Sequence, residues 1–429
     1  EWPLLPELFP VSFPGVQTCR DQALVDIERE RLESRMEKYF DPDITHEEMA
    51  GIGPVLMREA AGFKAKQTRE YLMKRGFLRD NIVRYCYRPF DPRWLYWEPE
   101  TKLLDRNRAD YVPHVFEGNR WIVAGQKARR ETARAQVIRN VGSRHLMERG
   151  ANVFPLYLGA DGLHASLFQG ADETKANLSD QAAACIARLS VNEGDLFDHT
   201  VAVLHSPAYL EENAGALRQD WPRIPLPATR EAILDSAELG RRIAALLDSE
   251  NPVKGVTSGR VRPELRAIGP VQRQGGGQLA GKNLRLTARW GYAGQNRVTM
   301  PGRGDARPRE FTGDEREAIE AGAAALGLAG KTAMDCLGDK TFDIYLNEVA
   351  YWRNVPERVW RYTIGGYQVV KKWLSYREYE LLGRPLTKEE AREVTNIIRR
   401  IAAILLLEPG LDANYRAICE DIYAWPGTP

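Results

Sequence analysis

The sequence predicts a mixed, helix-rich α+β fold with small sheets and one basic, glycine-rich insert. Three observations support this class. Long segments carry apolar residues at helical spacing, and short segments alternate or are rich in β-branched and aromatic residues. One internal window is rich in Arg and Gly but poor in aromatic residues. The 429 residues, 43% hydrophobic and 28% charged, have ordinary globular composition and correspond to two or three domains.

Helices are the most frequent of the predicted elements. Apolar residues recur between charges from Asp21, a suitable cap, to about Phe40. The capping boxes at Thr312 and Thr387, each with a Glu three residues later, predict two helix starts, the second helix running to about Leu407. Further helices are predicted at 46–60, 64–75, 178–190, 196–219, 228–248 and, after a Gly-Gly turn, 367–379.

Strands are predicted where the pattern shortens. Residues 82–97 alternate, carry several aromatic side chains and predict a strand followed by a turn. The same signal appears in three shorter segments, at 120–124, 153–158 and 342–346. No internal repeat is visible.

The charge of the chain is balanced overall but uneven locally. The formal net charge is +1, yet residues 254–309 hold twelve basic and two acidic residues, with eleven glycines. Residues 120–144 hold seven basic residues and one acidic residue. Such a window is either a solvated, partly disordered insert or a surface that faces nucleic acid. Two separate basic segments in a neutral chain favour the nucleic-acid surface.

We therefore predict that the side chains that contact nucleic acid come from these two segments. The candidates are Arg120, Lys127, Arg129, Arg130, Arg134, Arg139, Arg144, Arg260, Arg262, Arg273, Lys282, Arg285, Arg289, Trp290, Arg297 and Arg303. Trp290 and Tyr292 are expected to anchor an ordered ribbon, on which Arg289 and Arg297 would read bases. Arg273 is expected to contact phosphates.

The sequence predicts no catalytic residue, metal site or cofactor site in this chain. It has no phosphate-binding loop, nucleophile elbow, Asn-Pro-Pro-aromatic motif or Cys/His cluster, and its five cysteines are widely spaced. One acid-then-E-x-K arrangement, Asp91 with Glu100 and Lys102, leaves a metal-dependent nuclease as an alternative. A non-catalytic protein-interaction scaffold is another. The longest apolar run, 401–407, is too short to span a membrane, so no membrane partner is expected.

Several stretches, in their order and spacing, resemble one family over nearly the whole chain. They are 15–18 with Arg20-Asp21, 87–97, 154–158, 203–207 with Tyr209, 222–226, and 365–369 with 372–374. Together they resemble the C-terminal specificity region of type ISP single-polypeptide restriction–modification enzymes, in which an adenine-specific DNA methyltransferase is fused to a restriction enzyme.

The resemblance implies a sequence-specific, double-stranded DNA recognition module that lacks the methyl-transfer motifs itself. Its partners would be double-stranded DNA and an upstream methyltransferase domain of the same polypeptide, in the bacterial cytoplasm. S-adenosylmethionine, ATP and Mg would be needed only in upstream domains, and the first residue, Glu1, fits a piece of a longer polypeptide. The predicted organisation is a linker and helical lead-in (1–80), a target-recognition core (81–250), the basic insert (251–310) and an α+β subdomain (311–429).

Overall fold

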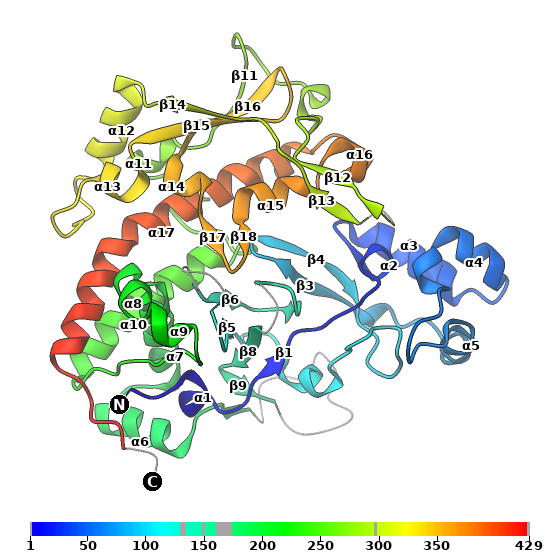
Figure 1. Ribbon diagram of the computed structural model, residues 1–429, viewed down its shortest axis with the longest axis horizontal. Helices are drawn as coiled ribbons and strands as arrows, with labels where there is room; N and C mark the ends of the chain where they lie inside the picture. Colours follow the sequence, from blue (N-terminus) through cyan, green and yellow to red (C-terminus); the bar gives the residue numbers. More distant parts are fainter. Residues whose placement is uncertain (1, 129–133, 148–150, 160–173, 296–297, 427–429) are drawn as a thin grey trace. The chain divides into compact units, whose positions relative to one another are not determined.

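The computed structural model describes residues 2–128, 134–147, 151–159, 174–295 and 298–426 (Figure 1). It divides into two compact units. The N-terminal unit contains Leu5–Lys127 and Gln136–Ala182, and the C-terminal unit contains Glu1–Leu4, Ala128–Ala135 and Ala183–Pro429. Helices and several small sheets occur in the described chain, which confirms the mixed α+β class. The predicted division into four segments (1–80, 81–250, 251–310 and 311–429) stays a prediction.

Two four-stranded sheets form the centre of the N-terminal unit, with strand orders β2-β4-β3-β7 and β1-β8-β5-β6. Adjacent strands are antiparallel except β3 and β7, which are parallel. Their bounds are β1 Phe13–Pro14, β2 Val25–Asp26, β3 Ile82–Arg88, β4 Asp91–Tyr96, β5 Trp121–Gly125, β6 Gln136–Ile138, β7 Val141–Gly142 and β8 Ala151–Pro155. A short ladder joins β9 (Tyr157–Leu158) to β10 (Lys175–Ala176). The predicted strand at 120–124 is present as β5. The segment 82–97, predicted as a strand followed by a turn, is a hairpin of β3 and β4, and 153–158 is divided between β8 and β9.

Helices complete this unit: α1 Leu5–Leu8, α2 Asp21–Leu24, α3 Arg29–Phe40, α4 His46–Ile52 and α5 Ala65–Arg75, with 3-10 turns η1 Pro54–Leu56, η2 Arg79–Asn81 and η3 Ala109–His114. The single helix predicted over 21–40 is wrong, because Val25 pairs with Leu95 of β4. The Asp26 side chain accepts hydrogen bonds from the Glu28 backbone and the Arg35 guanidinium, which stabilises the break.

Helices also dominate one part of the C-terminal unit. They are α6 Asp180–Leu189, which begins in the N-terminal unit, α7 Glu193–His205, α8 Pro207–Glu212, α9 Ala214–Leu217, α10 Arg230–Leu247 and α17 Lys388–Glu420. The predicted helix over 196–219 is three helices, because Ser206 caps α8 and Pro207 occupies its first position. Gly240 lets α10 approach α7 closely, since an added Cβ would lie 1.7 Å from the Asp198 carbonyl oxygen.

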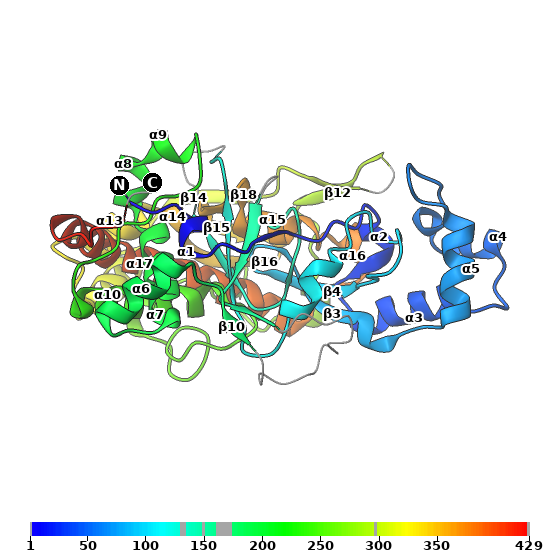
Figure 2. The ribbon, with the colours of Figure 1, turned by 90° about the horizontal axis from the view of Figure 1, so that it is seen from below.

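The longest helix, α17, lies beside α10 and continues well past its predicted end at Leu407 (Figures 1 and 2). Pro409 inside a helix removes one backbone hydrogen bond and costs about 3 kcal/mol. Hydrogen bonds connect this part of α17 to α8: the Asp412 carboxylate accepts from the Ser206 hydroxyl and from the Ala208 backbone at the start of α8. No helix among the described residues has the length and apolar character needed to cross a membrane.

A four-stranded antiparallel sheet, in the order β11-β16-β15-β14, forms the other part of the C-terminal unit. The strands are β11 Val271–Arg273, β14 Ala306–Glu310, β15 Lys340–Tyr345 and β16 Ala350–Pro356. Around it lie α11 Pro263–Arg266, α12 Gly313–Ala323, α13 Ala333–Leu337 and α14 Glu357–Trp360. Both predicted capping boxes are confirmed, at the starts of α12 and α17.

The basic insert is more ordered than its composition suggests. It contains α11, β11, η4 (Gly281–Leu284) and an antiparallel pair, β12 (Gly291–Ala293) and β13 (Thr299–Pro301), which we call the ribbon. It buries Leu265, Ile268, Leu284 and Leu286, so it contributes to the core. After a β17–β18 hairpin (Thr363–Ile364 and Tyr367–Gln368), α15 (Val369–Ser375) and α16 (Tyr379–Leu382) replace the one helix predicted at 367–379.

Candidate nucleic-acid interface

Trp290 fixes the base of the ribbon. Its side chain is fully buried, and its Nε1–H donates a hydrogen bond to the Tyr345 carbonyl at 2.8 Å. The Trp360 ring meets it edge-on, with 5.5 Å between ring centroids. Gly304 lies so close that an added Cβ would be 2.0 Å from Cε3 of the indole. This predicted candidate is therefore an anchor and does not present its ring to a ligand.

Glu378 holds the backbone at the same point. Its carboxylate accepts hydrogen bonds from the backbone N–H groups of Arg289 and Trp290, both at 2.9 Å. Burial raises the pKa of Glu378, while these backbone hydrogen bonds oppose the rise. Arg289 is left with a φ of 64° and an exposed side chain. The two hydrogen bonds to Glu378 therefore fix the backbone position from which the Arg289 side chain extends.

The two faces of the ribbon differ. On one face Gly291 meets α15, where an added Cβ would be 1.9 Å from the Ser375 carbonyl oxygen. Successive residues in a strand point to opposite faces, so Tyr292 and its cross-strand partner Met300 point away from α15. They are 50% and 41% exposed. The expected anchoring by Tyr292 is therefore wrong.

Sequence reasoning did not single out Tyr292 and Met300 as surface residues. The available signal was that Tyr292 lies between two small residues, Gly291 and Ala293, in a strand. This pattern does not show which face is exposed unless Gly291 is known to lie against a helix.

The C-terminal unit exposes six of the predicted basic side chains. Arg285 lies over the ring of Tyr379, with its guanidinium carbon 4.9 Å from the ring centroid. Lys282 lies on η4, and Arg273 ends β11. The six exposed candidates are Arg260, Arg273, Lys282, Arg285, Arg289 and Arg303. Exposed arginines and lysines on ordered backbone can contact phosphates or base edges.

Other arginines of the insert take part in structural ion pairs. Arg309 contacts Glu315 at 2.7 Å and Asp343 at 2.9 Å, and Arg353 joins the same Glu315 at 2.8 Å. The arginines lower the pKa of Glu315 against the effect of burial. The network connects β14, β15, β16 and α12, so part of the positive charge in the window stabilises the sheet.

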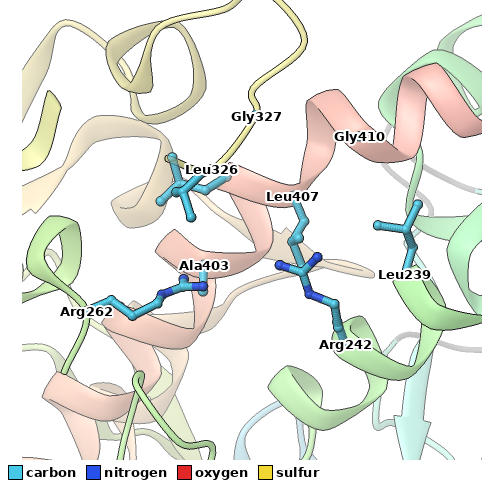
Figure 3. Close-up of a pocket in the computed structure, with 9 residues that line it drawn as sticks. Leu239, Arg242, Arg262, Leu326, Gly327, Ala403, Leu407 and Gly410 are labelled. Carbon is cyan, nitrogen blue, oxygen red and sulfur yellow. The ribbon is translucent and has the colours of Figure 1, made fainter. Parts of the chain in front are cut away.

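Arg262 lines a pocket of about 180 Å³ in the C-terminal unit (Figure 3). The pocket lies among α10, α17 and the segment after α12, and Arg242 is its second cationic side chain. Arg262 is paired with the buried Glu264 through Nε and Oε1 at 2.8 Å. Burial lowers the pKa of Arg262, and the nearby charge of Arg242 acts in the same direction. The rest of the lining is mostly apolar: Leu239, Leu326, Ala403, Leu406 and Leu407.

The second basic segment is divided. Arg134 belongs to the C-terminal unit and is buried, with Nη2 at 2.9 Å from Oε1 of Glu408. Arg358 contacts the other oxygen of Glu408 at 2.6 Å, and Arg134 also lies over the Tyr362 ring. This geometry favours a structural role for Arg134 over the predicted DNA contact.

The remaining predicted residues of this segment lie in the N-terminal unit or outside the described residues. Lys127 and Arg139 are exposed, and Arg120 and Arg144 are half-buried, with backbone hydrogen bonds to Leu156 and Val16. Arg129 and Arg130 lie outside the described residues, as does Arg297 of the insert.

The nuclease alternative receives no support from the geometry. Asp91 is fully buried, and its Oδ2 accepts hydrogen bonds from Nε and Nη2 of Arg93 at 3.1 and 2.7 Å. Glu100 lies beyond β4 and pairs with Arg75 at 3.2 Å. Each carboxylate therefore has its own arginine. The described part of the chain contains no group of three or more His, Cys, Asp or Glu residues that could hold a metal ion.

Comparison with known families gives a match over most of the chain. The family described as the type ISP C-terminal specificity domain matches residues 7–403. A search of curated proteins gives no match.

Three solved structures share the fold, and each aligns with 95% of this chain. The ATP-dependent type ISP restriction–modification enzyme LlaBIII bound to DNA is 15% identical, with a TM-score of 0.56. A DrdV–DNA complex is 19% identical, with a TM-score of 0.56. A nuclease-deletion mutant of the type ISP enzyme LlaGI with a DNA substrate mimic is 16% identical, with a TM-score of 0.52. The chain spans 23%, 36% and 33% of these longer chains.

Proposed function

Because the chain belongs to the family of type ISP C-terminal specificity domains, we propose that it reads the target sequence of a restriction–modification enzyme on double-stranded DNA. The solved structures with the same fold were determined with DNA or a DNA mimic, which supports DNA as the ligand class. The chain spans about a quarter to a third of those proteins. The proposed function is therefore that of one module of a larger enzyme.

The observation that carries the proposal is that the basic insert exposes six basic side chains on ordered backbone. They lie on η4, at the end of β11, at the base of the ribbon and in the connecting loops. Trp290 and Glu378 hold the backbone that presents Arg289. Phosphate contacts position a protein on DNA and base contacts give specificity, and both need side chains that leave a fixed backbone.

We assign the chemical steps to other domains of the polypeptide. S-adenosylmethionine, ATP and Mg would bind there, and an upstream methyltransferase domain would be the covalently attached partner, in the bacterial cytoplasm. The buried Asp91 and the exposed Glu100, each paired with an arginine, are consistent with a chain that binds DNA without cleaving it.

The salt dependence of duplex binding tests the proposal. If all six exposed side chains contact phosphates, log affinity should fall with log salt with a slope of about −5. Affinity would then fall about a thousandfold between 50 and 200 mM salt. Replacing Arg285 and Arg303 by Gln should make the slope shallower by about two.

The matched control replaces two arginines that are exposed elsewhere in the same unit. Arg316 on α12 and Arg361 after α14 each pair with a glutamate one helical turn away. Their replacement by Gln removes the same charge from the chain, so the slope should stay unchanged. A wild-type affinity that does not vary with salt would contradict the proposed function.

A further inference from the structure

The outer face of the ribbon is an exposed apolar patch. Three large apolar side chains lie close together there: Tyr292, Val298 and Met300, which are 50%, 53% and 41% exposed. Tyr292 and Met300 are direct cross-strand partners, and the Val298 carbonyl accepts a hydrogen bond from the Gly294 backbone. An added Cβ at Gly294 would lie 2.5 Å from Cγ of Met300, so the patch is continuous across the strands. Clustered exposed apolar side chains mark binding surfaces more often than isolated ones do.

The patch is held in place from behind. Gly291 lies against the backbone of α15, and Trp290 and Glu378 fix the first strand. Tyr292 and Met300 therefore leave a backbone that is already ordered. Binding through them needs little further loss of conformational freedom.

Charge around the patch indicates the chemistry of its partner. The sequence from Arg289 to Gly304 contains no Asp or Glu. Arg289 and Arg303 are both exposed at the base of the ribbon, where the Gly304 N–H donates a hydrogen bond to the Arg289 carbonyl. The next acid, Asp305, is already paired with Arg307 at 2.7 Å. An apolar patch next to two cations, with no acid in the ribbon, complements a ligand that carries apolar groups beside anions. DNA has this arrangement, and three side chains are far fewer than a stable protein interface needs.

A two-stranded ribbon fits the major groove of DNA, where the only apolar group on the base edges is the C5-methyl of thymine. We propose that Tyr292 and Met300 contact thymine methyl groups in the major groove, while Arg289 and Arg303, at the base of the ribbon, contact phosphates on one side of that groove. This inference rests on the proposed function and adds a chemical basis for base preference. It assigns base reading to Tyr292 and Met300, whereas the charge pattern alone suggested Arg289 and Arg297.

The experiment uses duplexes that the wild-type chain enriches from a randomised pool. Each enriched duplex is compared with a copy in which uracil replaces thymine, which removes only the methyl group. Wild type should bind the uracil copy about fourfold more weakly for each contacted methyl group. The double variant Tyr292→Ser, Met300→Ser should bind both copies equally and lose the enriched preference.

Two controls separate this contact from folding effects. Tyr71→Ser changes a 53% exposed tyrosine on α5 and should behave as wild type with both duplexes. The double variant should unfold at the wild-type temperature, because both side chains lie on the surface.

Three outcomes would overturn the inference while leaving DNA recognition intact. The enriched motif could lack thymine, or wild type could bind the uracil copies as tightly as the thymine duplexes. Replacing thymine by uracil could also weaken binding equally in wild type and in the double variant. Failure of wild type to enrich any motif, together with salt-independent binding, would instead refute the proposed function.

Discussion

Two buried histidines should make the C-terminal unit sensitive to mild acid. His199 is fully buried, with Nε2 2.9 Å from the Pro225 carbonyl and Nδ1 2.8 Å from the Ser236 hydroxyl. The carbonyl can only accept, so Nε2 carries a proton and donates to it. Nδ1 then accepts a hydrogen bond from the Ser236 hydroxyl, and the ring is neutral. Burial lowers the pKa of His199 to about 4. Burial and the nearby Arg134 lower the pKa of His205 to about 3.

The magnitude follows from proton linkage. In the unfolded chain a histidine takes up its proton below about pH 6.5, whereas these two stay neutral in the folded unit. The unfolded state then binds more protons, so stability is complete above pH 6.5 and falls as the pH drops toward 4. At pH 5, about 1.5 pH units below the unfolded value, each histidine should reduce the free energy of unfolding by about 2 kcal/mol.

Urea unfolding at pH 7, 6 and 5 measures this loss. The variant His199→Gln keeps an N–H group that can donate to the Pro225 carbonyl but cannot take up the proton. Its free energy of unfolding should therefore fall by about 2 kcal/mol less than that of wild type between pH 7 and 5. Carboxyl groups with a raised pKa, such as Glu378, act in the opposite direction, and comparing the two proteins cancels their effect. An identical pH dependence in both proteins would refute the reasoning.

Three further predictions concern the ion pairs, the ribbon and the chemistry. Arg134→Ala should lower the free energy of unfolding by about 3 kcal/mol, because it breaks a buried pair with Glu408, while the salt slope of DNA binding stays at the wild-type value. Gly304→Ala should displace the Trp290 ring, lower thermal stability and weaken DNA binding, whereas Gly275→Ala, with similar φ but open space around it, should do neither beyond the backbone strain that both share. The isolated chain, supplied with radiolabelled S-adenosylmethionine or with Mg²⁺, should neither methylate nor cut duplex DNA; incorporation or nicking would place catalysis inside this chain.

Local signals in the sequence predicted what local interactions decide. The boxes at Thr312 and Thr387 were predictable because both partners of each capping pair lie within one helical turn. The break at Val25 was not, because its strand partner, Leu95, is distant in sequence. Tertiary pairing there overrides the helical periodicity of the surrounding residues.

The candidate site shows the same limit. A local count of charges found the basic insert but gave every arginine equal weight. Arg134 is buried in an ion pair with Glu408, which lies 274 residues later in the sequence. Arg262 is half-buried and pairs with Glu264, and a count of charges does not show that Glu264 is buried. Tyr292 looked like core from its residue type alone. Only the close contact of Gly291 with α15 determines which face of the strand meets water.

In the ribbon, the residues that hold the fold and the residues that meet solvent are different ones. Its inward contacts come from Trp290, Gly291 and Gly304, whereas Tyr292 and Met300 meet solvent. Surface substitutions that break no buried contact usually change stability by less than about 0.5 kcal/mol. The outward positions can therefore vary over many residue types while the scaffold beneath them is kept. This makes the ribbon a natural position for a combinatorial library, in which altered sequence preference could be selected without first stabilising the fold.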